Sequence, residues 1–244
     1  MTVHELFRAG KLREAIQQLG NELRNDPGDN KRRTFLFELL CFAGEYSRAE
    51  KHLTMLSDAS PDAQMGALLY RSALTAERKR RAFFEAKQYA EGGEIPVIGR
   101  SGTLNGEKFH SIEDIDPRIG SRLEVFIAGE YMWLPFAHVG SLTMGPPKFL
   151  RDLLWSSATV TASPAMQDKD MGEVLLPTLY PFSSTAERDE VKLGRETEWV
   201  LSEQEPLEIP YGQKLFVLDG ERSVPILEIR SLQFDDSIPQ PLPS

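Results

Sequence analysis

The sequence predicts an α+β protein in which helical repeats come first and a mostly antiparallel β-rich domain follows. The first ninety residues contain a repeated sequence motif that is typical of paired helices. Beyond residue 100, apolar residues alternate with a period close to two, which is typical of strands. Between these parts, residues 91–96 read Glu-Gly-Gly-Glu-Ile-Pro, a combination that interrupts helices. We therefore expect a helical domain over residues 1–90, a linker over residues 91–100 and a β-rich domain over residues 101–244.

The repeat in the helical part has a spacing of 34 residues, and its two copies read AGKLREAIQQLGNELRNDP and AGEYSRAEKHLTMLSDASP. Each copy has a glycine for a helix–helix turn, a small residue where two helices approach, a large apolar residue one turn later and a proline at its end. The paired positions are Gly10 with Gly44, Ala15 with Ala49, Leu19 with Leu53, and Pro27 with Pro61. This order predicts antiparallel helix pairs of the tetratricopeptide type.

The predicted array is short. A third copy begins near Gln64 but has no second matching register, and Glu22 stands where the motif favours a small residue. Such arrays are stabilised by contacts between neighbouring repeats. We therefore expect the C-terminal half of the chain to cover the helices.

Alternating apolar residues predict the strands of the second half. The predicted strands cover residues 122–128, 131–136, 153–162, 172–179, 214–218 and 225–230. Turns at Gly129-Glu130 and at Asp219-Gly220 make hairpins of the first two and the last two strands. Residues 146–154 predict a short helix or a loop inserted into the sheet.

Composition indicates a cytoplasmic protein. Hydrophobic residues make up 41% of the 244 residues, which supports a packed core. No run of 18 apolar residues occurs, so we expect no membrane span, and the first residues lack the pattern of a secretory signal. The lone cysteine, Cys41, excludes an intrachain disulfide and fits a reducing compartment.

Charge is divided unevenly along the chain. Residues 1–90 hold 15 Lys and Arg against 12 Asp and Glu, while the remainder holds 13 against 25. The acidic second half argues against binding of nucleic acid, because phosphate groups require basic partners. The basic run 78–81 is expected to be a solvated helix face, with contact to an acidic partner as the alternative.

Few residues suggest catalysis. No HExxH, paired CxxC, GxGxxG, GxxxxGK[ST] or GxSxG motif occurs. His110, Glu113, Asp114 and Asp116 have the ligand types for a divalent metal, which keeps open a metal-dependent enzyme as an alternative. The opposing interpretation is an acidic segment leading into a turn, and we predict that these side chains do not converge. Cys41 lies among apolar residues and is expected to be a buried structural thiol rather than a nucleophile. From these observations together we predict no cofactor and no enzymatic activity.

Several segments resemble the ImpE/TagJ family of type VI secretion accessory proteins along nearly the whole chain. They are RAGKLREAIQQLGNELRNDPGD (8–29), FLFELLCFAGEYSRAEKHL (35–53), DPRIGSRLEVFIAGEYMWLPF (116–136), RDLLWSSATV (151–160), GEVLLPTLYPFSS (172–184) and LGRETEW (193–199). In the last segment we expect Arg195 to face carboxylates, and we expect Trp199, like Trp133 and Trp155, to lie in the core.

The resemblance implies a non-enzymatic adaptor in the bacterial cytoplasm. It implies binding to a helix of the small sheath subunit and a link to the AAA+ ATPase that recycles the contracted sheath. No catalytic residue follows from the resemblance. The alternative is a generic repeat cochaperone without a link to secretion. Genes for the sheath and the ATPase next to the gene for this protein would argue against that alternative.

In tetratricopeptide arrays the first helix of each repeat lines the concave face, where partners usually bind. The register places eight candidate partner-binding residues there: Lys31, Thr34, Glu38, Cys41, Met65, Leu68, Ser72 and Thr75. Their mixture of apolar, polar and charged groups suits an amphipathic helix in a groove. The alternative is that the β-rich domain packs over these positions and uses them as core.

Overall fold

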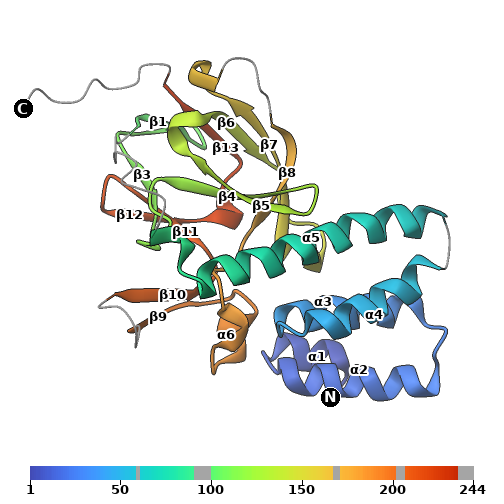
Figure 1. Cartoon of the computed structure of the whole chain (residues 1–244). Coiled ribbons are helices and arrows are strands. Elements are labelled where there is room, and N and C mark those ends of the chain that lie inside the picture. The colour runs from blue at the N-terminus through green and yellow to red at the C-terminus, as the bar shows by residue number, and fades with distance from the viewer. Residues whose placement is uncertain (59–60, 91–99, 167–170, 202–206, 236–244) are drawn as a thin grey trace, which may run out of the picture.

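The computed structural model describes residues 1–58, 61–90, 100–166, 171–201 and 207–235, and it has helices at the N-terminus followed by antiparallel sheets (Figure 1). The first helices are α1 (Val3–Arg8), α2 (Leu12–Asn25), α3 (Asn30–Phe42), α4 (Tyr46–Ser57) and α5 (Pro61–Glu85). The fold is therefore α+β, as predicted. Residues 91–99 of the predicted linker lie outside the described residues. No helix among the described residues is long and apolar enough to cross a membrane.

The repeat positions are structurally equivalent in the two copies. Gly10 and Gly44 follow α1 and α3, and both have φ +70°, a conformation that glycine adopts without strain. Ala15 and Ala49 are fully buried at the start of α2 and α4, where the helices approach closely. The third copy supplies only α5, a single helix of 25 residues. Its tetratricopeptide character remains a prediction from the sequence register.

Within the described ranges, the strands form one large sheet and two small ones, and every strand pair is antiparallel. The eight-stranded sheet has the order β2 (Glu107–Phe109), β1 (Gly102–Leu104), β13 (Ser231–Phe234), β6 (Val139–Met144), β7 (Trp155–Ala162), β8 (Gly172–Pro177), β4 (Arg122–Ile127) and β5 (Glu130–Pro135). The small sheets are β12 (Arg222–Pro225), β11 (Leu215–Leu218) and β3 (Ile112–Asp114), and the pair β10 (Glu208–Gly212) and β9 (Thr197–Leu201). Short helices interrupt the strands, among them η2 (Phe136–His138), η3 (Leu150–Leu153), η4 (Pro164–Met166), η5 (Ser183–Thr185), α6 (Asp189–Lys192) and η6 (Ile226–Glu228), while η1 (Gln88–Ala90) follows α5.

Both predicted hairpins are present, with small shifts. The turn between β4 and β5 is Ala128-Gly129 rather than Gly129-Glu130, and both turn residues have positive φ. The second hairpin turns at Asp219-Gly220 as predicted, but β12 ends at Pro225 and η6 follows it, so the predicted strand 225–230 is wrong. Proline has no N–H for a further ladder hydrogen bond, which explains why the strand stops there.

The described residues form two hydrophobic cores. One lies between the large sheet and the three-stranded sheet, and it includes Phe216 and Leu218 of β11 together with Val139 and Leu142 of β6. The other belongs mainly to α1–α5 but also includes Leu154 and Trp155 of the β-rich part. The C-terminal half of the chain therefore packs against the helices. This agrees with the prediction that so short an array of repeats needs a cover.

Candidate partner-binding site

The exposed surface of α5 is apolar near its N-terminal end. Met65, Leu68 and Leu69 are 71%, 59% and 47% exposed, within little more than one helical turn. Figure 1 shows this half of α5 extending beyond the large sheet, while its C-terminal half lies along the sheet. Clustered large apolar side chains on a surface are typical of a protein-binding site.

A cavity of about 230 Å³ lies beside these residues. Leu69, Ser72 and Ala73 of α5 line one wall, and the β4–β5 turn and parts of β7 and β8 line the other. Gly129 of this turn lies close to α5, because a Cβ atom there would be 3.7 Å from Ser72 Cα. The cavity therefore lies directly next to the exposed apolar turn.

The structure divides the eight predicted residues between an open and a covered part. Helices α3 and α5 contact each other through Phe37 and Tyr70, whose ring centroids are 5.9 Å apart. The accessible residues of the predicted set are Lys31, Thr34, Met65, Leu68, Ser72 and Thr75, whereas Glu38 and Cys41 are buried. Lys31 also lines a groove of about 680 Å³ between α1, α2 and α3.

Glu38 and Cys41 are covered by the β-rich part. Arg151 of η3 lies over the ring of Tyr70, and its Nη1 is 3.9 Å from Glu38 Oε1. Burial raises the pKa of Glu38 to about 7, even though Arg151 acts to lower it. Burial also raises the pKa of the Cys41 thiol well above its usual value, so Cys41 is a buried structural thiol as predicted. At these two positions the second half of the chain occupies the predicted groove.

A buried network of charged groups holds α5 against the sheet. Arg80 donates to Glu124 through Nε at 2.8 Å and through Nη2 at 2.7 Å, a bidentate pair, and its Nη2 also donates to the Leu179 carbonyl at 2.9 Å. Lys214 Nζ donates to Glu124 Oε2 at 2.6 Å and also to Asp114. Because all four charges are paired, their burial is tolerated and fixes how α5 lies on the sheet.

The two carboxylates of this network have opposite pKa shifts. Burial acts to raise the pKa of Glu124, but Arg80 and Lys214 outweigh it and hold the pKa well below its usual value. For Asp114, burial outweighs the lowering effect of Lys214 and raises the pKa to about 6. Glu124 is thus the charged centre of the network.

The burial of Arg80 corrects the expectation that residues 78–81 form a solvated helix face. Arg80 is 2% exposed, whereas Arg78, Lys79 and Arg81 stay at the surface. Helical spacing carries the missed signal, since buried Ala73, Ala76 and Phe84 lie on the same side of α5 as Arg80.

The residues of the alternative metal site have other partners or other positions. Asp114 is paired with Lys214, and Asp116 accepts hydrogen bonds from Arg118 Nε at 2.9 Å and Nη2 at 2.6 Å. His110 is exposed, and Glu113 points to the other side of β3 from Asp114. Within the described part of the chain, no three His, Cys, Asp or Glu side chains come together as a metal site would require.

The segment after β8 attaches the β-rich part to the repeat turns. A Cβ atom on Gly10 would collide with the Glu190 carboxylate, and one on Gly44 would lie 2.5 Å from Ser184 Oγ. The two repeat glycines are therefore needed for close approach as well as for their positive φ. Asp189 Oδ2 accepts from the Leu12 N–H at 2.8 Å, which caps α2, a helix without a capping side chain of its own.

The LGRETEW segment takes part in this attachment. Arg195 pairs with Glu190 at 3.0 Å, as expected of a residue facing carboxylates, and it also donates to the carbonyls of Phe7 and Arg8 at the end of α1. The expected burial of Trp199 is wrong, because this side chain is 45% exposed on β9. Among the described residues, no side chain of β9 or β10 belongs to either hydrophobic core. Trp155 is buried as expected, and Trp133 is half-buried.

Comparison with known proteins first defines the class of fold. Protein VPA1032 from Vibrio parahaemolyticus, known from a crystal structure, is 23% identical to this chain and superposes with a TM-score of 0.82 over 97% of this chain and 98% of its own. The α+β arrangement of helices on a large antiparallel sheet is therefore shared with a solved protein.

Sequence similarity then gives the family. The profile of the ImpE protein family matches residues 106–233, which contain Asp114, Glu124 and Lys214. The type VI secretion system accessory component TagJ of Pseudomonas aeruginosa is 30% identical over 267 residues, covering 96% of this chain and 92% of that protein. The chain belongs to the ImpE family.

Proposed function

We propose that this protein is a non-enzymatic accessory component of a bacterial type VI secretion system and acts in the cytoplasm as an adaptor. The similarity to TagJ over nearly the whole chain supports an accessory role. Within the described residues, the buried acidic groups around Asp114 and Asp116 are already paired with Lys214 and Arg118, which leaves the metal-enzyme alternative without a site. The function then resides in surfaces that bind other proteins.

The proposed partner is an amphipathic helix of the small sheath subunit, bound along the N-terminal halves of α3 and α5. The exposed turn with Met65, Leu68 and Leu69 is the observation that supports this most directly. These side chains would bury their apolar surface against the helix, and the neighbouring cavity would accept one anchoring side chain. Thr75 is exposed nearly two turns beyond Leu68 and Leu69 on α5, and Lys31 and Thr34 lie on the open half of α3, which suits them to polar contacts at the edge. Glu38 and Cys41, by contrast, belong to the interior.

The tetratricopeptide-like register fits this proposal, because α1, α3 and α5 are then the first helices of successive repeats. The proposal includes a link from the bound sheath subunit to the AAA+ ATPase that recycles the sheath. A ternary complex of the three purified proteins in size-exclusion chromatography would test this link, and separate elution of the ATPase would argue against it.

Replacing Leu68 with Asp tests the proposed surface. The change removes a buried leucine from the complex and places a carboxylate against the apolar face of the helix, so we expect the dissociation constant to rise at least tenfold, or about 1.4 kcal/mol. Isothermal titration calorimetry with the purified small sheath subunit measures this change.

Leu201→Asp is the matched control, because Leu201 is 68% exposed on β9, away from α5. It should bind like the wild type, and circular dichroism should show both variants folded. Equal affinities for wild type and Leu68→Asp would rule out the α5 surface.

A further inference from the structure

A separate cleft of about 480 Å³ lies between α2, the start of α4 and α6. Its wall along α2 includes Leu12, Ile16 and Gly20, which are spaced by four residues and lie on one face of the helix. Leu12 and Ile16 are buried, and a Cβ atom on Gly20 would meet nothing within 4 Å. The floor of the cleft is therefore apolar, with open space above Gly20.

The rim of this cleft is basic in a protein of net charge −9. Four basic residues line it, namely Arg13, Arg24, Arg48 and Lys192, against the two carboxylates of Glu45 and Asp189. Both carboxylates are already paired within the cleft, Glu45 with Arg48 and Asp189 with Lys192.

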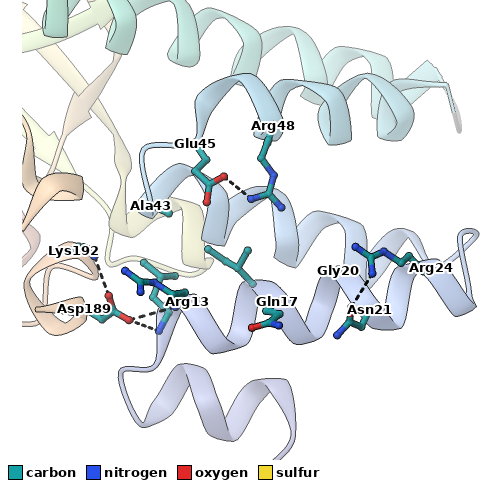
Figure 2. A pocket seen from close by; sticks show the side chains of 12 residues that line it. Arg13, Gln17, Gly20, Asn21, Arg24, Ala43, Glu45, Arg48, Asp189 and Lys192 are labelled. Carbon is teal, nitrogen blue, oxygen red and sulfur yellow. Dashed lines mark hydrogen bonds and ion pairs between the residues drawn. The ribbon is translucent and has the colours of Figure 1, made fainter. Parts of the chain in front are cut away.

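Two of the four basic side chains remain available. In the part of the chain that the structure describes, neither Arg13 nor Arg24 forms an ion pair, and Arg24 only donates to the Asn21 side chain at 3.2 Å. Figure 2 shows Arg13 at the α6 end of α2 and Arg24 near the opposite end. The cleft thus has positive charge at both ends and an apolar floor between them.

The spacing of the two arginines indicates the form of a ligand. They are eleven residues apart on α2, which corresponds to about 16 Å along the helix axis. An extended peptide covers about 16 Å in five residues. A ligand with carboxylates at that separation would meet both guanidinium groups with charge-assisted hydrogen bonds, and an apolar residue at its centre would lie on Ile16 and above Gly20.

We propose that this cleft binds an extended acidic segment of a second partner protein, with carboxylates at Arg13 and Arg24 and an apolar side chain between them. Apolar floor residues and the two rim carboxylates disfavour a nucleic-acid backbone, whose charge is not interrupted by apolar groups. The cleft is separate from the α5 surface, so this inference does not depend on whether the sheath subunit binds α5.

The test uses a fluorescein-labelled peptide, Glu-Glu-Ser-Leu-Ser-Glu-Glu, and fluorescence anisotropy with the full-length protein. Gly20→Glu places a carboxylate in the open space of the cleft, on a helical position that accepts a side chain without collision. We expect it to weaken peptide binding at least tenfold, while Gly20→Ala, which leaves the cleft open, binds like the wild type. Raising the salt concentration from 50 to 300 mM should also weaken binding.

Gly66→Glu is a crossed control, because Gly66 on α5 also has open space at its Cβ position and lies beside Met65. Gly66→Glu should leave peptide binding unchanged and weaken binding of the sheath subunit. Gly20→Glu should weaken peptide binding and leave binding of the sheath subunit unchanged. The two proposals therefore fail independently of each other.

Several outcomes would overturn the inference. One is no saturable binding of the peptide at millimolar concentration, and another is equal binding of a peptide with lysines in place of its glutamates. Equal affinity of wild type and Gly20→Glu would show that the peptide binds elsewhere. Self-association of the wild type that Gly20→Glu abolishes, measured by sedimentation equilibrium, would identify a second copy of this chain as the occupant instead.

Discussion

Replacing Glu38 with Gln should make the protein more stable at neutral and alkaline pH. Glu38 is only 7% exposed beneath η3, and the nearest guanidinium nitrogen of Arg151 is 3.9 Å from its carboxylate, too long for a hydrogen bond, so besides this charge only the Arg151 backbone N–H acts to lower its pKa. Desolvation therefore outweighs this attraction and raises the pKa from 4.5 to about 7. Glutamine retains the shape of the side chain but carries no charge to desolvate.

The magnitude follows from linkage between protonation and folding. In the folded state Glu38 binds its proton up to a pH of about 7, whereas in the unfolded chain it releases it near 4.5. Between these values the folded state binds more protons than the unfolded state, so stability falls as the pH rises. Each pKa unit corresponds to about 1.4 kcal/mol, so the wild type should lose about 2 to 3 kcal/mol relative to Glu38→Gln between pH 5 and pH 8.

Urea unfolding of both proteins at pH 5, 6, 7 and 8 measures this difference. Glu14→Gln provides a control for the same chemical change at an exposed position of α2. A difference between wild type and Glu38→Gln that stays constant from pH 5 to pH 8 would refute the reasoning. A variant that becomes less stable than the wild type as the pH rises would show that attraction to Arg151 outweighs desolvation.

Three further experiments test the contacts that join the two parts of the chain. Arg80→Met leaves Glu124 buried with one fewer cationic partner and should lower the free energy of unfolding by about 3 to 5 kcal/mol in urea titrations; a loss below 1 kcal/mol would show that the network is dispensable. Gly66→Ala should stabilise the protein by about 0.5 to 1 kcal/mol and raise its melting temperature, because Gly66 is helical and has open space at its Cβ position. Gly44→Ala should lower the melting temperature, because Gly44 has φ +70° and its Cβ atom would collide with Ser184. A shift of the same sign in both variants would contradict this difference between the two glycines. Asp189→Ala removes the cap of α2 and should cost about 1 kcal/mol, with faster amide hydrogen exchange in the first turn of α2 than in α4; unchanged exchange there would contradict the capping role.

Local features of the sequence predicted the elements well. The 34-residue register predicted the turns at Gly10 and Gly44, because glycine can adopt positive φ where two helices meet. Asp219-Gly220 predicted its hairpin for the same conformational reason. The sequence also indicated that so few helices need a cover, because apolar faces of repeat helices are buried only by neighbours.

The resemblance to the ImpE/TagJ family rested on several segments that occur in the same order along nearly the whole chain, and the sequence comparisons confirm it. The strand after Pro225 was wrong by several residues, because alternation of apolar residues does not distinguish a strand from a short helix that packs one side chain inward. Element type was thus better determined than element boundaries.

By itself, the sequence determined which segments become helices or hairpins. Tertiary structure alone decided which candidate residues remain accessible. Glu38 and Cys41 have the register of a binding face, yet η3 and β7 cover them, while Met65 and Leu68 stay open. Arg80 belongs to a basic run that suggests solvent, yet it is buried against Glu124, a residue 44 positions away. Periodicity describes each helix separately, whereas burial depends on which distant segment packs against it, and that choice is made by the free energy of the whole fold.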